Sequence, residues 1–116
     1  MHNVNIGVVA SVLSEETGKK EFLSAAEDTY HPIETILPNN DLDIEYNISL
    51  LISKYTSINK DFAHMSTFLD IIKHNNNIWI YYGVALPSEI EIKDCYRLSQ
   101  NICIINPLVR KAIKYV

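Results

Sequence analysis

Residues 67–86, which read TFLDIIKHNNNIWIYYGVAL, decide the fold class of this chain. The run IWIYYGVAL at 78–86 is rich in aromatic and β-branched side chains, which is typical of a strand. The preceding HNNN at 74–77 predicts a turn, because asparagine tolerates left-handed backbone conformations. Residues 67–73 fit a helix or a strand by their spacing, and the turn that follows them favours a strand. The stretch therefore predicts a β-hairpin.

The sequence before this hairpin predicts strands followed by a helix. Residues 4–13 (VNIGVVASVL) predict a largely buried strand, and a turn at 15–18 leads to a return strand over 21–26. Residues 33–37 lie between two prolines and predict a short strand near a sheet edge. Residues 42–58 predict a long helix, because one apolar stripe recurs at helical spacing: Ile44, Ile48, Leu51, Tyr55 and Ile58.

The sequence after the hairpin ends in a second helix. Residues 89–93 (EIEIK) alternate and predict a short strand or an extended loop, and residues 102–105 are a brief apolar run. Asn106 and Pro107 predict a helix start, since Asn is a favourable N-cap and Pro fits the first helical position. This order of elements predicts an α+β fold rather than a doubly wound parallel sheet.

Length and composition predict one globular domain, and the charge of the chain excludes some classes of partner. The 116 residues, 47% hydrophobic and 21% charged, are typical of a single domain over residues 1–116. Fourteen Asp and Glu outnumber ten Lys and Arg, and no basic run is longer than Lys19-Lys20. We therefore expect neither duplex DNA nor a membrane as partner, because both are bound through clustered positive charge.

The sequence also predicts a cytoplasmic location. It shows no secretory leader and no apolar run of the roughly 20 residues that a membrane span needs. Cys95 and Cys103 match neither a zinc nor a redox motif, which predicts buried free thiols in a reducing compartment. The 17 Ile and 11 Asn residues are encoded by A/T-rich codons, which suggests a low-GC bacterium or a phage as the source.

Four segments of the chain resemble the Nudix family. They are the strand at 4–13, the ILPN at 36–39, which resembles the LPGG turn of the family, the strand at 78–87 and the terminal helix at 106–116. The resemblance spans nearly the whole chain. It implies a Nudix-like mixed-sheet α/β/α sandwich with one long central helix and a C-terminal helix.

The diagnostic Nudix box departs from its pattern in this chain. The box reads G-x5-E-x7-R-E-U-x-E-E-x-G-U, with U aliphatic, and its carboxylates share one helix face to hold Mg²⁺ or Mn²⁺ against a substrate diphosphate. Aligned on residues 50–58, the Arg and Glu positions hold Leu50, Leu51, Lys54 and Tyr55. Because an ammonium group repels a cation, we expect no metal cofactor on this helix and no catalytic residue.

Other acidic residues offer a fallback metal site. Asp41, Asp43 and Glu45 stand at the start of the predicted helix, where the helix dipole favours carboxylates in any case. Together with Asp70, they are the candidate Mg²⁺ or Mn²⁺ ligands if the chain is a divergent hydrolase. The sequence contains no zinc-binding histidine spacing, nucleophile elbow or glycine-rich phosphate loop.

The candidate ligand-binding residues are aromatic or basic. Trp79 and Tyr81 share one face of the strand at 78–86 and Tyr82 lies on the other, where rings either stack a nucleobase or pack in the core. Arg97 and Arg110 belong to a basic grouping that either receives a phosphate or an acidic partner or is solvated charge. Its remaining members are Lys93, Lys111 and Lys114.

These observations lead to one functional prediction and two alternatives. The predicted function is that of a non-catalytic Nudix-fold protein that binds a partner protein or a small nucleotide-like ligand. The first alternative is a divergent metal-dependent hydrolase of nucleoside-diphosphate derivatives. The second is a small phage or bacterial accessory protein that regulates a larger complex. A homo-oligomer is compatible with all three.

Overall fold

The strand β1, Asn3–Leu13, lies at the centre of a six-stranded mixed sheet. On one side β5, Asn77–Leu86, runs parallel to it in a register that covers nearly the full length of both strands. On the other side β1 pairs antiparallel with β3, Ile33–Ile36, through its first half and with β2, Lys20–Ser24, at its end. The predicted strands over 4–13, 21–26, 33–37 and 78–86 are thus confirmed with small shifts of their bounds.

Two further strands form the ends of the sheet. The order is β4-β5-β1-β2-β6, with β4 spanning Ser66–His74 and β6 spanning Tyr96–Ser99. β4 and β5 form the predicted hairpin, and Asn75 in its turn has a positive φ of 55°. A register shift between Phe68 and Asp70 leaves a bulge in β4.

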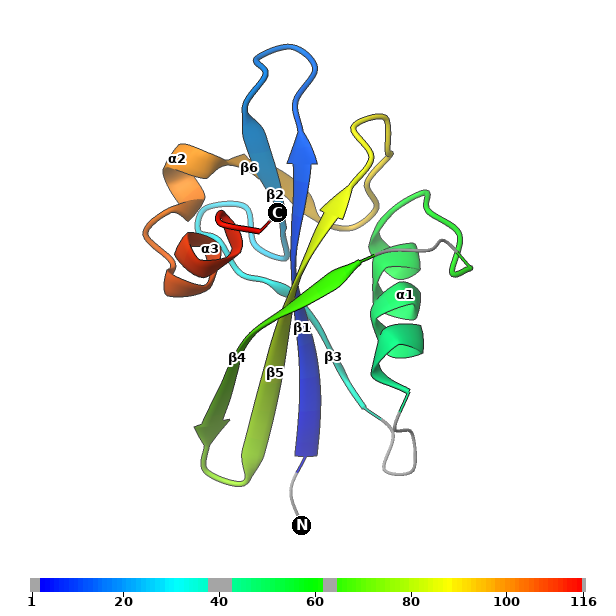
Figure 1. Ribbon diagram of the computed structural model, residues 1–116, viewed down its shortest axis with the longest axis vertical. Coiled ribbons are helices and arrows are strands. Elements are labelled where there is room, and N and C mark those ends of the chain that lie inside the picture. The colour runs from blue at the N-terminus through cyan, green and yellow to red at the C-terminus, as the bar shows by residue number, and fades with distance from the viewer. Residues whose placement is uncertain (1–2, 38–42, 62–64, 116) are drawn as a thin grey trace.

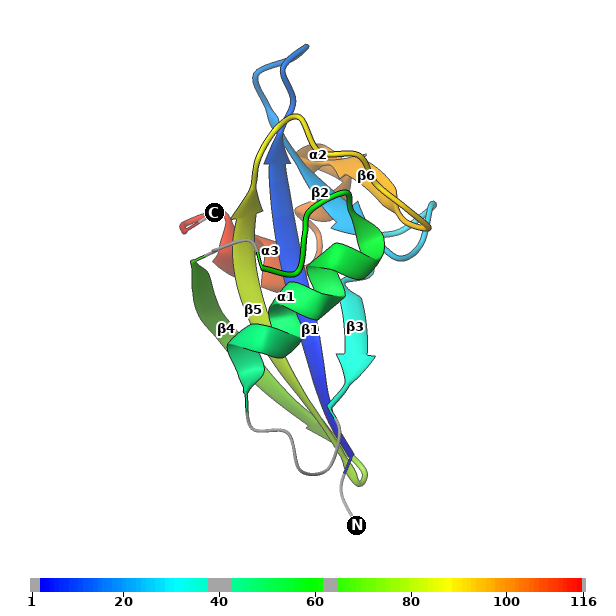
Figure 2. The same cartoon turned by 90° about the vertical axis from the view of Figure 1, so that its right-hand side faces the viewer.

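Helices cover both faces of the sheet. Figure 1 shows α1, Ile44–Tyr55, on one side of β1 and α3, Pro107–Ala112, on the other, and Figure 2 shows α1 crossing the sheet obliquely. The short α2, Gln100–Cys103, lies beside α3. Asn106 caps α3 by accepting a hydrogen bond from the N–H of Leu108 at 2.8 Å, as predicted. The predicted α/β/α sandwich is therefore confirmed.

The structure, a computed structural model, describes residues 3–37, 43–61 and 65–115. Pro38, Asn39 and Asp41, which carry part of the turn resemblance and one candidate metal ligand, lie outside these residues. Over the described ranges, none of the helices has the length and apolarity that crossing a membrane requires.

Two hydrophobic cores lie on the two faces of the sheet, and β1 contributes to both. Ile6, Val8, Ala10 and Val12 point toward α1, whereas Val9 points toward α3. α1 adds Ile48, Leu51 and Ile52 to the first core. Each of these three aliphatic side chains is at most 2% exposed and stabilises the fold by about 1.5–3 kcal/mol.

Gly7 is required where the chain crosses the second core. Gly7 lies opposite Tyr81 in the parallel β1–β5 register, and a Cβ at Gly7 would overlap the Tyr81 ring. The ring continues across β1 to β3, where the Tyr81 hydroxyl donates a hydrogen bond of 2.9 Å to Oε1 of Glu34. Burial and the Glu34 carboxylate both raise the pKa of Tyr81. The absence of a side chain at Gly7 thus allows β5 to reach β3.

The C-terminal end of α1 differs from the prediction, because the helix over 42–58 was predicted too long. Thr56 adopts an extended backbone at φ −140° and ψ 172°. Its buried hydroxyl donates to the carbonyl of Ile52 at 2.8 Å and accepts from the N–H of Ile58 at 3.1 Å. These bonds end the helix at Tyr55, while Ile58 still packs against the first core.

The segment over 89–93 is an extended loop rather than a strand. Ile92 makes an isolated β-bridge to Thr56, and the Lys93 N–H donates to the Tyr55 carbonyl at 2.8 Å. The strand that follows, β6, and the helix α2 were not predicted. Each has only four residues, too few for a period in the sequence to indicate it.

Replacement of Gly7 tests the close approach of Tyr81. We expect Gly7→Ala to lower the free energy of unfolding by about 1–3 kcal/mol, because overpacking forces the ring out of place. Urea denaturation measures this loss. In a Tyr81→Ala background the same Gly7→Ala change should cost much less, and an equal cost in both backgrounds would contradict the overlap.

A second prediction concerns Tyr30 in the core beneath α3. Its side chain is 8% exposed, and among the described residues its hydroxyl is the buried side-chain oxygen without a hydrogen-bond partner. Since an unsatisfied buried group costs about 1–3 kcal/mol, Tyr30→Phe should stabilise the protein. Tyr81→Phe is the matched control and should destabilise it, because it removes the bond to Glu34. Destabilisation by Tyr30→Phe in the same denaturation experiment would show that the hydroxyl is satisfied.

Candidate functional site

Of the four α1 positions that the resemblance assigns to the Nudix box, two pack in the first core and two lie at the surface. Leu51 is 2% exposed within the first core, and half-buried Tyr55 packs against the same core. Leu50 lies at the surface. The Lys54 ammonium lies 5.4 Å from the centroid of the Tyr55 ring, which is a cation–π distance. The helix thus presents hydrocarbon and positive charge at these positions.

The acidic candidates that the structure describes do not gather at one place. Asp43 is the N-cap of α1, and its Oδ1 accepts a hydrogen bond from the Tyr46 N–H at 3.0 Å. Glu45 is exposed in the first helical turn. Asp70 belongs to β4 and pairs with Lys111 of α3 at 2.9 Å, on the opposite side of the sheet from α1. These carboxylates therefore have no common point at which to hold an ion.

Asp70 is engaged twice at the outer edge of β4. Besides Lys111, its carboxylate accepts a hydrogen bond from the Ile71 N–H at 2.9 Å. The hydrogen bond from Lys111, followed by that from the backbone, lowers the pKa of Asp70. Within the described residues, no three or more His, Cys, Asp or Glu side chains are placed to share a metal ion.

The three aromatic candidates lie on two faces of β5. Trp79 and Tyr81 pack with the core beneath α3, and Tyr82 packs with the core beneath α1. Tyr82 also makes an edge-to-face contact with Phe68 of β4, with 6.0 Å between the ring centroids. The structure thus brings Trp79 and Tyr81 together but separates both from Tyr82.

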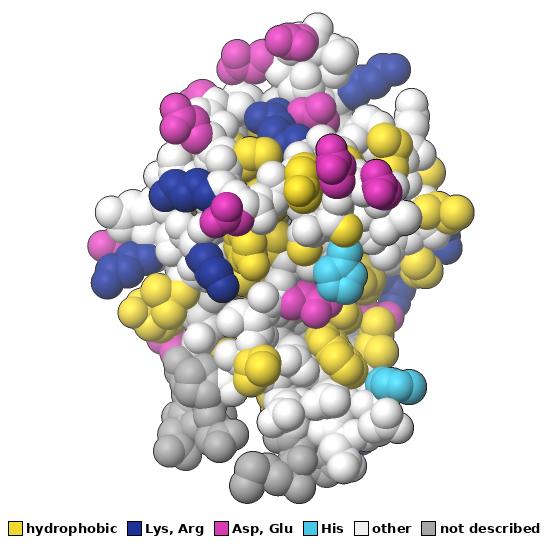
Figure 3. All heavy atoms as spheres, turned by 180° about the vertical axis from the view of Figure 1, so that it is seen from behind, with side chains coloured by type: hydrophobic (Ala, Val, Ile, Leu, Met, Phe, Trp, Pro, Cys, Tyr) yellow, Lys and Arg dark blue, Asp and Glu magenta, His cyan; other side chains and the backbone are white. Residues whose placement is uncertain are grey.

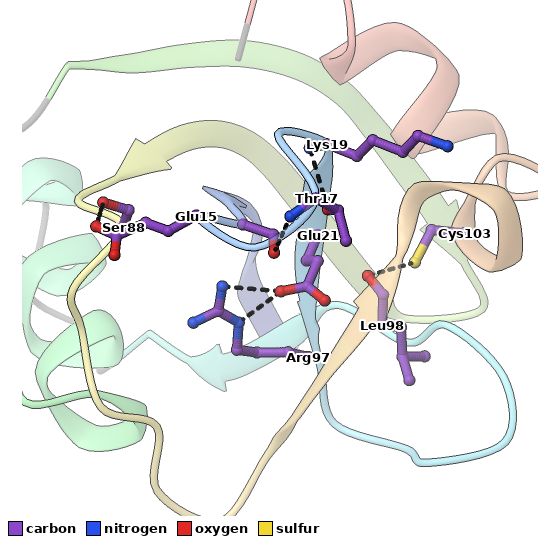
Figure 4. A network of polar contacts seen from close by, with 9 residues as sticks. Glu15, Thr17, Lys19, Glu21, Ser88, Arg97, Leu98 and Cys103 are labelled. Atoms are coloured by element: carbon purple, nitrogen blue, oxygen red, sulfur yellow. Dashed lines mark hydrogen bonds and ion pairs between the residues drawn. The ribbon is translucent and has the colours of Figure 1, made fainter.

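Arg97 lies at a polar cavity at the far end of the sheet. From β6 its Nε and a terminal nitrogen bind Oε1 of Glu21 at 2.9 and 2.8 Å, as Figure 4 shows. The cavity has a volume of about 310 Å³ and is also lined by Ser14, Glu15, Glu16 and Ser88. The Ser88 hydroxyl lies 3.0 Å from a carboxylate oxygen of Glu15. Three carboxylates and one arginine line this cavity, so its charge suits a cation better than a phosphate.

Arg110 holds the connection between α2 and α3. Its Nη1 donates to the carbonyls of Ile104 at 3.0 Å and Ile105 at 2.9 Å. The basic grouping of the sequence is accordingly divided, with Arg97 on β6, Arg110 on α3 and Lys93 in the loop that contacts α1. The guanidinium groups of Arg97 and Arg110 both donate hydrogen bonds to other groups of the protein.

The two cysteines are buried free thiols, as the sequence predicts. Cys103 is fully buried, and its Sγ lies 3.7 Å from the Leu98 carbonyl oxygen to which it donates. Burial raises the pKa of the Cys103 thiol to about 11 and also raises that of Cys95. Because the thiolate is the reactive form, neither residue is suited to act as a nucleophile near neutral pH.

Sequence reasoning did not identify Glu34 and Gly7, which join β3, β1 and β5 through Tyr81. The signal that could have found them is the parallel register of β1 and β5, which places Gly7 opposite Tyr81. A parallel pairing joins segments some 70 residues apart in this chain and leaves no local pattern. His31, whose Nε2 lies 3.8 Å from Oε1 of Glu34, extends the same group toward the surface.

Comparison by sequence gives no match, either to a protein-family model or to a curated protein. Comparison by structure gives close matches that cover nearly the whole chain. The structure of the C-terminal domain of mouse MUTYH in complex with human PCNA matches with a TM-score of 0.70 at 11% identity, over 98% of this chain and 86% of that chain.

Two further matches are Nudix proteins. The NUDIX domain of Shewanella oneidensis NrtR, solved in complex with ADP-ribose, matches with a TM-score of 0.69 at 8% identity, over 98% of this chain and 88% of that chain. A binary complex of the C. elegans Ap4A hydrolase matches with a TM-score of 0.62 at 15% identity, over 97% and 96% of the two chains. Together with the mixed sheet between α1 and α3, these matches show that the chain has a Nudix-like fold.

Proposed function

We propose that this chain is a non-catalytic Nudix-fold protein that acts by binding a nucleotide-like ligand or a partner protein. The observation that carries the proposal is the packing of α1. At the box positions, Leu51 and Tyr55 pack in the first core, and Lys54 places an ammonium group beside them on the helix. Mg²⁺ and Mn²⁺ prefer several oxygen ligands at one point, and these side chains supply none apart from the Tyr55 hydroxyl. The residues present do not fit the divalent ion of the family.

The structural neighbours support binding by both classes of partner. NrtR presents a NUDIX domain in complex with ADP-ribose, and the MUTYH domain is found in complex with PCNA. Both matches span nearly the whole of this chain, so the same scaffold accommodates a small nucleotide ligand in one case and a protein complex in the other. The proposal includes a cytoplasmic location and a low-GC bacterium or a phage as the source; a small accessory protein that regulates a larger complex remains a separate alternative.

The alternative with a specific precedent is hydrolysis, since the Ap4A hydrolase shares the fold. It would require ligands outside the box, and the carboxylates at the start of α1 in the sequence are Asp41, Asp43 and Glu45. Asp43 is already occupied as the helix cap. Hydrolysis is therefore the weaker candidate.

A turnover assay separates the two functions. Incubated with Mg²⁺ or Mn²⁺ and a panel of ADP-ribose, dinucleoside polyphosphates and nucleoside triphosphates, the protein should release no product above a protein-free blank. An authentic Nudix hydrolase with an intact box serves as the positive control. Turnover that disappears in Asp41→Ala or Glu45→Ala would refute the proposal.

Thermal unfolding with the same nucleotides then distinguishes the two kinds of partner. A nucleotide that binds the native state at 100 times its Kd adds about 2.7 kcal/mol of stability and raises the Tm without turnover. Such a shift would favour the nucleotide-like ligand, and an unchanged Tm across the panel would favour the protein partner.

Variants of Asp43 test whether this residue is a helix cap or a metal ligand. Asp43→Ala should lower the free energy of unfolding by about 1 kcal/mol, whereas Asp43→Asn should retain the cap and nearly all of the stability. Both are measured by urea denaturation with and without Mg²⁺. If Mg²⁺ stabilised the native protein but not Asp43→Asn, Asp43 would be a ligand and the interpretation would fail.

A further inference from the structure

Two hollows flank the C-terminal end of α3, on the side of the sheet away from α1. The larger, of about 520 Å³, lies between the β1–β2 hairpin, α2 and Ile113, and its lining includes Leu13, Lys19 and Lys20. The smaller, of about 240 Å³, lies between α3 and β4, and its lining includes Phe68, Lys111, Lys114 and Tyr115. Ile113 is followed directly by Lys114 and Tyr115, so the hollows adjoin across one turn of chain. We call this region the α3 surface.

The charge of the α3 surface is opposite to that of the whole chain. Four lysines and no carboxylate are among the described residues that line the two hollows. The chain as a whole has 14 Asp and Glu against 10 Lys and Arg. On the face seen from behind, basic and acidic side chains are instead intermingled (Figure 3). The concentration of lysines on the α3 surface therefore favours an acidic occupant.

The lysines of the α3 surface differ in the contacts that their side chains make. Lys111 pairs with Asp70, which lies beside the smaller hollow. The Lys19 side chain extends away from the ion pair between Glu21 of β2 and Arg97 of β6, as Figure 4 shows. Lys19 and Lys114 are both exposed. Lys19 is part of the lining of the larger hollow and Lys114 of the smaller.

Apolar side chains accompany this charge. Leu13 is 51% exposed, Phe68 53% and Tyr115 65%, and each of them lines one of the two hollows. Large side chains that are half exposed around a concave site are typical of a protein interface, in which they pack against apolar anchors of the partner.

We infer that the α3 surface docks a segment of a partner protein that carries acidic side chains around apolar anchor residues. The anchors fill the two hollows, and the carboxylates pair with Lys19 and Lys114 at the rim. This inference rests on the proposed function, because it names the partner that a binding protein of this fold would take. A single nucleic-acid strand fits less well, since base stacking requires aromatic rings. Phe68 and Tyr115 line only the smaller hollow, and the described lining of the larger hollow has only aliphatic apolar side chains, Leu13 and Ile113.

Selection from a random-peptide display library on the immobilised full chain tests the inference. We expect the selected peptides to be enriched in Asp and Glu together with Leu, Ile or Phe. A double charge reversal, Lys19→Glu with Lys114→Glu, should weaken the best of these peptides by about tenfold or more, measured by fluorescence anisotropy. Thermal unfolding of each variant confirms that it is folded.

A matched control has the same net charge but alters the other side of the molecule. Lys60→Glu with Lys93→Glu changes two exposed lysines, of which one follows α1 and the other belongs to the loop bonded to Tyr55. The control should bind the selected peptides as tightly as the native chain does. Equal weakening by both double variants would mean that net charge alone drives binding, and would overturn the inference.

The remaining outcomes of the selection experiment also test the docking surface. Failure to select any peptide, or selection of peptides without acidic enrichment, would refute the docking surface. A labelled single-stranded oligonucleotide is tested in parallel, and tight binding that the Lys19→Glu and Lys114→Glu pair abolishes would assign the surface to nucleic acid instead. None of these results depends on turnover. If the binding tests fail and no hydrolysis is seen, only the docking inference is refuted and the proposed function stands. Hydrolysis would overturn the proposed function directly.

Discussion

The passage of the Tyr81 ring over Gly7 is the contact on which the rest of the sheet depends. It aligns β5 with β1, and through the hydroxyl it also fixes β3 on the far side of β1. Three strands from distant parts of the sequence are thereby held by one side chain. Both layers of helices pack on the sheet that results, since β1 contributes alternate residues to each core.

The helix α1 illustrates how a scaffold can keep its shape while its chemistry changes. Its apolar stripe is complete, with Ile48, Leu51 and Ile52 in the core, and its ends are defined by the Asp43 cap and the Thr56 hydroxyl. Structural roles thus account for the residues at both ends and on the inner face. A metal-binding role would have to use the outer face that remains, which carries one carboxylate, Glu45, together with Leu50 and Lys54.

Local patterns in the sequence predicted the elements that have a period or a cap, and missed those that do not. The stripe on α1, the aromatic and β-branched run of β5 and the Asn106 cap of α3 were all visible before the structure. The end of α1 was missed because a threonine hydroxyl, rather than a glycine or proline, ends the helix. The division of the basic grouping was missed for another reason. Residues close in sequence, such as Arg97 and Arg110, are separated by pairings with Glu21 and with backbone carbonyls that only the fold reveals.

The outer edge of β4 has features that oppose pairing with a strand of another molecule. A long edge strand with exposed Ile71 and Ile72 is the usual template on which identical chains add to one another and grow into fibrils. Here the bulge after Phe68 breaks the regular edge, and the Asp70 carboxylate occupies the N–H of Ile71. An incoming strand would have to displace that carboxylate from both Ile71 and Lys111. Both features oppose the pairing of a further strand with this edge, although the edge carries exposed apolar side chains.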